Sequence, residues 1–155
     1  MNREPNTVAI REAVRADIGR LITIEAQFPG DRLERRHFLH AVRSPSIVAL
    51  VAELDGQAAG YALLETRRRS ATGRISSIAV APETSGKGVG RCLLSAVEEE
   101  SLRRGRDAVR LEVRADNDRA IALYDGCGYR RTGRTEAYYD DGCAAVRFEK
   151  ALADG

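Results

Sequence analysis

The sequence predicts a single-domain α/β protein built around a mixed sheet. Strand-like and helix-like patterns alternate along the 155 residues without a linker-like break, and a chain of this length suits one domain with a sizeable core. Two apolar strands meet at Asp55-Gly56, a pair typical of the turn in an antiparallel hairpin. A further apolar strand leads into a turn that contains Gly86, Gly88 and Gly90, and this turn opens directly into a long helix.

The first half of the chain alternates between the two periodicities. Apolar residues alternate with polar ones in the strand segments and recur every three or four positions in the helical segments. Asp31, which follows Pro29-Gly30, is suited to cap the second helix. These patterns predict, in order, a strand at 7–13, helices at 17–28 and from 31 to about 42, and strands at 46–53 and 57–66.

The second half continues the alternation. The helix that follows the glycine-rich turn ends near residue 104, because Gly105 is a typical helix terminator. Asp116 or Asn117 is suited to cap a short helix that stops at Gly126. The predicted elements are a strand at 74–81, a helix to about 104, a strand at 109–114, a helix at 119–124, and strands at 129–139 and 144–150.

Composition narrows the class of protein. The 25 basic and 23 acidic residues leave a net charge of only +2, which does not favour a nucleic-acid partner. Three cysteines without metal-ligand spacing, Cys92, Cys127 and Cys143, are expected to be free thiols in a reducing cytoplasm, and no metal is expected. No run of about 18 apolar residues predicts a membrane span, so we expect a soluble, cytoplasmic protein with no membrane partner.

The turn at Gly86-Lys87-Gly88-Val89-Gly90 predicts a phosphate site or a tight packing turn. Glycines leave the backbone amides bare, and the first N–H groups of a helix have no partner within it. The spacing fits neither a Walker A loop nor a dinucleotide fingerprint, because the hydroxyl after the lysine is missing and the third glycine comes one residue early. The turn by itself does not decide between the two interpretations.

A second segment carries a family resemblance. The stretch from Leu111 to Tyr129, which includes Glu112, Asn117 and Tyr124, resembles the second acetyl-CoA motif of the Gcn5-related N-acetyltransferases, in particular the ribosomal-protein-alanine branch. The strand and turn at 78–90 resemble the family's first motif. The resemblance covers residues 5–152 and implies a single N-acetyltransferase domain. Its fold would be a mixed, mostly antiparallel sheet of about seven strands with about four helices, whose central strands splay to form the acetyl-CoA cleft.

The resemblance also implies which residues bind the cosubstrate, acetyl-CoA. The turn would hold the pyrophosphate, although Lys87 could equally be a solvated lysine and Ser85 replaces the Gln or Arg that the family usually has. Asn117 would contact the pantetheine or only cap its helix, and both roles can hold at once. The implied cofactor-binding residues are Ile78, Ala79, Val80, Ser85, Gly86, Lys87, Gly88, Val89, Gly90 and Asn117.

Two residues are candidates for the chemistry. Tyr124 corresponds to the family's general acid, and a phenol with a pKa near 10 can donate a proton to the departing CoA thiolate; the alternative is a core aromatic beside Ile121. Glu112 aligns with the glutamate that serves as general base in the ribosomal-protein branch. The alternative is a surface salt-bridge residue, because Arg110 and Arg114 flank it on the polar face of its strand.

The acceptor amine is the least defined part. The pair Tyr138-Tyr139 before Asp140-Asp141 resembles the family's peptide-binding side, where the two carboxylates would attract a cationic amine; the alternative is an ordinary exposed hairpin. We expect an acetyl-CoA-dependent N-acetyltransferase acting on the N-terminal α-amine of a protein or peptide. A small amine acceptor (a polyamine, an amino acid or an aminoglycoside) and a non-catalytic acyl-CoA sensor are the alternatives. Many relatives dimerise, so a homodimer is compatible with the family.

Overall fold

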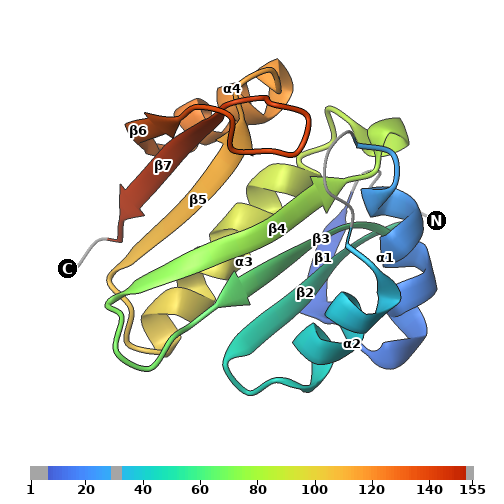
Figure 1. The fold of residues 1–155 in the computed structure, drawn as a ribbon. Coiled ribbons are helices and arrows are strands. Elements are labelled where there is room, and N and C mark those ends of the chain that lie inside the picture. The colour runs from blue at the N-terminus through green and yellow to red at the C-terminus, as the bar shows by residue number, and fades with distance from the viewer. Residues whose placement is uncertain (1–6, 29–32, 153–155) are drawn as a thin grey trace.

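A computed structural model describes residues 7–28 and 33–152 and contains one seven-stranded sheet with the strand order β1-β2-β3-β4-β5-β7-β6 (Figure 1). Every neighbouring pair is antiparallel except β4 and β5, which run parallel. The predicted mixed, mostly antiparallel sheet is therefore confirmed. The strands are β1 (Val8–Glu12), β2 (Ile47–Leu54), β3 (Gln57–Glu65), β4 (Thr72–Val80), β5 (Ala108–Arg114), β6 (Arg130–Thr135) and β7 (Ala145–Ala151).

Helices cover both faces of the sheet (Figure 1). Helices α1 (Ile18–Glu25) and α2 (Arg35–Arg43) pack on one face against β2 and β3, and α3 (Val89–Arg103) packs on the other. Helix α4 (Asp118–Gly126) follows β5, and short 3-10 turns occur at η1 (Arg15–Asp17) and η2 (Pro82–Thr84). No helix among the described residues is both long and apolar enough to cross a bilayer.

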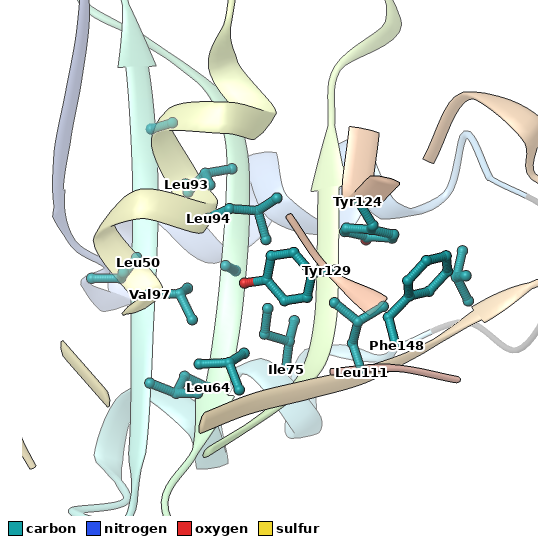
Figure 2. Packing of buried hydrophobic residues seen from close by; sticks show 14 of the residues in the cluster. Leu50, Leu64, Ile75, Leu93, Leu94, Val97, Leu111, Tyr124, Tyr129 and Phe148 are labelled. Carbon is teal, nitrogen blue, oxygen red and sulfur yellow. The ribbon is translucent and has the colours of Figure 1, made fainter. Parts of the chain in front are cut away.

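Alternation along the strands creates two cores. On the face of α1 and α2, Tyr61 and Val51 pack with Phe38 of α2, whose ring meets that of Tyr61 edge-on at 5.3 Å. On the face of α3, Leu93 and Leu94 pack against side chains from the strands (Figure 2). Burial of such large apolar side chains contributes roughly 1.5–3 kcal/mol each, so both cores hold the helices to the central strands.

The central parallel strands separate halfway along their length. Strand β4 pairs with β5 only from Thr72 to Ile75, opposite Ala108 to Leu111, although β4 continues to Val80 and β5 to Arg114. Beyond this point β4 still pairs with β3 on its other edge. The predicted splay of the central strands is confirmed, and it leaves the second half of β4 with one edge open.

The structure differs from the sequence-based elements mainly at their ends. Strand β6 stops at Thr135 rather than near Tyr139, because Ala137 has a φ of 51° and the chain turns there, closed by the Tyr139 N–H bonding Cys143 O at 3.1 Å. Helix α1 ends at Glu25 and α2 begins at Arg35, while the proposed cap Asp31 lies outside the described residues. Asn117 caps α4, accepting the Ala120 N–H at 3.1 Å, as predicted.

Candidate active site

A cavity of about 650 Å³ opens where β4 and β5 separate. Its walls come from the second half of β4, the glycine-rich turn, the first turn of α3, helix α4 and the end of α1. The two predicted motifs therefore line one cavity, although they lie far apart in the sequence. The predicted site residues in its lining are Ile78, Ala79, Val80, Ser85, Gly86, Gly88, Val89, Gly90, Asn117 and Tyr124.

The turn before α3 has the backbone geometry of an anion cradle. Gly86 and Gly88 have φ values of 82° and 81°, in the left-handed region that favours glycine. The first helical bond of α3 is donated by Cys92 to Gly88 O at 3.0 Å. The N–H groups ahead of Cys92 at the helix start therefore have no partner within the helix, and they carry the positive end of its dipole.

The third glycine has a packing role. A Cβ placed on Gly90 would lie 2.8 Å from Leu123 Cδ2 of α4. Gly90 thus allows the first turn of α3 to approach α4 closely, and this contact brings the two halves of the cavity together. The packing interpretation of the turn holds at Gly90, whereas the cradle geometry belongs to Gly86 and Gly88.

Arg119 is a cavity residue that sequence reasoning missed. It lies in the first turn of α4, and its Nη1 donates to Ser85 Oγ at 2.8 Å. A guanidinium from α4 therefore reaches the position where Ser85 replaces the usual Gln or Arg. The sequence held no local signal for this contact, because 34 residues separate the partners. Lys87 is not among the lining residues, although it lies in the turn.

Tyr124 is at once a core aromatic and a cavity residue. Its exposed fraction is 4%, and its ring lies 5.9 Å from Tyr129 and 5.5 Å from Phe148, in edge and tilted arrangements (Figure 2). Burial raises the pKa of Tyr124 above its usual value near 10. The hydroxyl therefore holds its proton at neutral pH, and the two interpretations of this residue are compatible.

The cavity lining also contains polar residues that the sequence did not single out. Tyr61 of β3 and Ser77 of β4 share a hydrogen bond of 2.7 Å between their hydroxyls. Glu25, at the end of α1, lies in the same lining, and burial raises the pKa of Tyr61. In the sequence, Tyr61 has the pattern of an ordinary aromatic residue in a strand. Only its place in the cavity lining identifies it as a candidate site residue.

Glu112 lies outside the cavity lining but next to the point where the strands separate. It follows Leu111, the last β5 residue paired with β4, and projects to the face opposite the Leu111 side chain. Its side chain is 8% exposed, and Arg74 of β4 donates to Oε1 from Nε at 3.0 Å and from Nη2 at 2.8 Å. Glu112 is therefore a salt-bridge residue, as the alternative has it, but its side chain is mostly covered and lies in a network across three strands. The proposed role as a base stays a prediction.

The Tyr138-Tyr139 segment is a structured turn rather than a strand end. The two rings meet edge-on at 4.9 Å, and the Arg114 guanidinium lies over the Tyr139 ring at 5.2 Å. Burial, with smaller contributions from Tyr138 and Glu112, raises the pKa of Tyr139 to about 12. Both tyrosines lie outside the cavity lining, with Tyr138 exposed.

Asp141 is not available as a free carboxylate for an amine. Arg114 donates to Asp141 at 2.7 Å and to Asp116 at 3.0 Å, and it lowers the pKa of both carboxyls. The negative charge of Asp141, which was expected to attract a cationic amine, is therefore largely neutralised by Arg114. The cysteines Cys92, Cys127 and Cys143 are free and half-buried.

Comparison with known proteins places this geometry in a family. The sequence model described as acetyltransferase (GNAT) family matches residues 15–129. The N-alpha-acetyltransferase RimI of Mycobacterium tuberculosis is 35% identical over 143 residues, which cover 90% of this chain and 89% of that protein. The [ribosomal protein bS18]-alanine N-acetyltransferase of Escherichia coli K12 is 36% identical over 85 residues, covering 55% of this chain and 56% of that protein.

A solved structure shows the same fold. The crystal structure of Ard1 from Thermoplasma volcanium superposes with a TM-score of 0.86 at 27% identity, and the match covers 95% of this chain and 99% of that chain. The extent of the family match and the identity over nine-tenths of the chain agree with the cavity built from both predicted motifs. The protein belongs to the acetyltransferase (GNAT) family.

Proposed function

We propose that the protein transfers an acetyl group from acetyl-CoA to the N-terminal α-amine of a protein or peptide. The observation that carries the proposal is one cavity that joins a phosphate cradle, the open edge of β4 and the Tyr124 side chain. The names of the similar proteins, N-alpha-acetyltransferase and ribosomal-protein-alanine N-acetyltransferase, support an α-amine as the acceptor.

The residues present fit the CoA moiety. The cradle formed by Gly86, Gly88 and the start of α3 suits a pyrophosphate, and Arg119 adds a positive charge beside it. From Ser76 to Val80, the edge of β4 that faces β5 has no strand partner in the described sheet, so its backbone groups are free to bond an extended amide chain such as pantetheine. When bound, acetyl-CoA would supply the thioester from which the acetyl group is transferred.

Tyr124 and Glu112 are the proposed proton carriers. Tyr124 lines the cavity, and its neutral hydroxyl would donate its proton to the departing thiolate sulfur. Glu112 lies on the other side of the sheet, where the strands separate. It would accept the proton of the amine through a water molecule. An α-amine with a pKa near 8 loses its proton to a carboxylate more easily than a lysine amine with a pKa near 10.4.

The acceptor would approach over the Tyr138-Tyr139 turn, where the charge of Glu112 contributes to the raised pKa of Tyr139. A tyrosine pair offers a flat apolar surface with hydroxyl groups for an extended peptide backbone. A cytoplasmic location and a homodimer remain predictions from the sequence.

Release of CoA thiol with a panel of acceptors tests the proposal. We expect turnover with peptides that carry a free α-amine and none with the same peptides blocked at the N-terminus. Turnover with polyamines, amino acids or aminoglycosides alone would move the acceptor to small amines. Binding of acetyl-CoA without turnover of any amine would indicate a sensor instead.

A further inference from the structure

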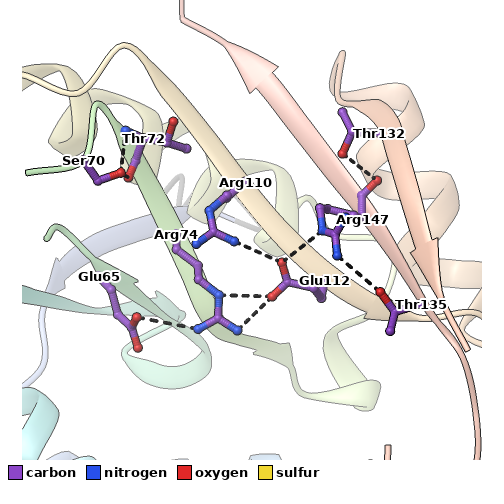
Figure 3. A network of polar contacts seen from close by, with 9 residues as sticks. All are labelled: Glu65, Ser70, Thr72, Arg74, Arg110, Glu112, Thr132, Thr135 and Arg147. Carbon is purple, nitrogen blue, oxygen red and sulfur yellow. Dashed lines mark hydrogen bonds and ion pairs between the residues drawn. The ribbon is translucent and has the colours of Figure 1, made fainter. Parts of the chain in front are cut away.

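Three arginines converge on the single carboxylate of Glu112 (Figure 3). Arg74 of β4 donates two hydrogen bonds to Oε1, from Nε at 3.0 Å and from Nη2 at 2.8 Å. Arg110 of β5 reaches Oε2 from Nη1 at 3.4 Å, and Arg147 of β7 lies 4.0 Å from the same oxygen through Nε. The network therefore gives Arg74 short bonds and leaves Arg110 and Arg147 with long contacts to a shared atom.

Arg110 and Arg147 retain most of their hydrogen-bonding capacity. A guanidinium has five N–H donors. Among the residues that the structure describes, Arg110 uses one donor on Glu112 and Arg147 uses one on Thr135 Oγ1 at 3.2 Å. Their side chains are 39% and 41% exposed, against 8% for Glu112. Two adjacent arginines thus present donors to solvent above a carboxylate that is already bound by a third.

The position of Arg147 is held by its surroundings. A Cβ placed on Gly133 of β6 would lie 2.9 Å from Arg147 Nη1, so the guanidinium rests where any larger residue would exclude it. The register of β6 and β7 shifts between Arg131 and Gly133, which brings Gly133 opposite Arg147. The Thr135 bond fixes the other end of the guanidinium. Arg147 is therefore oriented before any ligand arrives, which reduces the entropy lost on binding.

Apart from Glu112, no carboxylate within the described part of the chain forms an ion pair with Arg110 or Arg147. Glu65 lies 3.6 Å from Arg74, on the far side of the network from Arg147. Glu149 lies opposite Arg110 in the β5–β7 register, but no ion pair joins them within the described residues. Asp141 and Asp116 are bound to Arg114. Among the described residues, Glu112 is thus the carboxylate that Arg110 and Arg147 share as an ion-pair partner, and both arginines keep exposed N–H groups next to the proposed acceptor path.

We propose that Arg110 and Arg147 bind a carboxylate of the acceptor, so that the enzyme prefers peptides with Asp or Glu as the second or third residue. This inference rests on the proposed function, because it places the acceptor amine at Glu112. Residues of an extended chain are about 3.3 Å apart, and Arg147 directly opposes Glu112 across β5 and β7. A carboxylate one or two residues from the amine therefore comes within reach of these donors, and charge-assisted bonds to guanidinium are the stronger class.

Matched peptides and variants test the inference. One pair of peptides begins Ala-Glu or Ala-Gln, and a second pair carries Glu or Gln as the third residue. The kcat/KM of each peptide is measured from the release of CoA. We expect the wild-type enzyme to favour the acidic peptide by roughly threefold to tenfold at low salt, with the ratio falling as salt screens the partly exposed site. Arg147→Gln and Arg110→Gln should each bring the ratio towards one.

Arg134→Gln is the matched control. Arg134 is an exposed β6 arginine that pairs with Glu136 outside the network, so the preference should be unchanged in this variant. An equal rate for both peptides with the wild-type enzyme, or a preference that survives both Arg147→Gln and Arg110→Gln, would overturn the inference and leave the proposed function standing. Failure to acetylate any peptide, with turnover of small amines, would contradict the proposed function itself.

Discussion

The proposed cofactor half and the proposed acceptor half of this site are built in different ways. The cofactor half uses backbone groups: the amides of the glycine-rich turn, the start of α3 and the open edge of β4. The acceptor half uses side chains from β4, β5 and β7 and the Tyr138-Tyr139 turn. A backbone site depends on local conformation, whereas a side-chain network depends on strand register. Substitutions of side chains in the network are therefore expected to change the preference for the acceptor more than the binding of the cofactor.

Tyr124→Phe is expected to have the largest effect, because it removes the proposed acid and keeps the ring packing. We predict a fall in kcat of about 100-fold, within the usual range for a general acid, with little change in the KM for acetyl-CoA. Steady-state kinetics with both substrates measure this. Tyr129→Phe is the control: its hydroxyl bonds Glu98 at 2.9 Å outside the cavity, so stability should fall while kcat holds. An unaltered kcat in Tyr124→Phe would remove the acid role.

Glu112→Gln tests the chemistry of the acceptor half. We predict a loss in kcat/KM of about tenfold near pH 7 that shrinks towards pH 9, because an α-amine with a pKa near 8 then loses its proton without help. A pH profile of kcat/KM for a peptide substrate measures this. Glu65→Gln is the control, since it removes the other carboxylate beside Arg74 but leaves the bonds between Arg74 and Glu112 intact. A loss that is the same at every pH would make Glu112 a structural member of the network.

Arg119→Gln should have the smallest effect on the kinetics. It distinguishes the cofactor half from the acceptor half, because only the KM for acetyl-CoA should change. Its guanidinium is exposed beside the cradle, and an exposed ion contact contributes up to about 1 kcal/mol. We predict a rise of about threefold in the KM for acetyl-CoA and no change in the KM for the peptide, measured by varying each substrate in turn. Arg103→Gln, at the far end of α3, should change neither. A rise confined to the peptide KM would place Arg119 with the acceptor instead.

Local patterns predicted most of the fold. The strand and helix segments and the Asp55-Gly56 hairpin are confirmed, because apolar periodicity and turn residues act within a few positions of each other. The errors lie where one local signal was overridden. Residues 136–139 carry strand-like tyrosines, yet Ala137 turns the chain and the Cys143 carbonyl closes the turn.

The candidate site was only partly predictable. Asn117, Tyr124 and the turn glycines were recognised because each lies within a contiguous motif, and they meet in one cavity. Arg119, Tyr61 and Ser77 were missed since their partners lie on other elements. The position of Lys87 in the turn predicts a contact with the cofactor, but Lys87 is not among the residues that line the cavity.

The sequence by itself determined the order of the elements, the glycine turn at the start of α3 and the family resemblance, because these depend on neighbouring residues. Only the tertiary structure decided that Glu112 lies beneath three arginines, and that Arg119 reaches Ser85. Strand register and the splay of β4 from β5 bring these groups together. The spacing of residues along the chain predicts neither the strand register nor the contacts that follow from it.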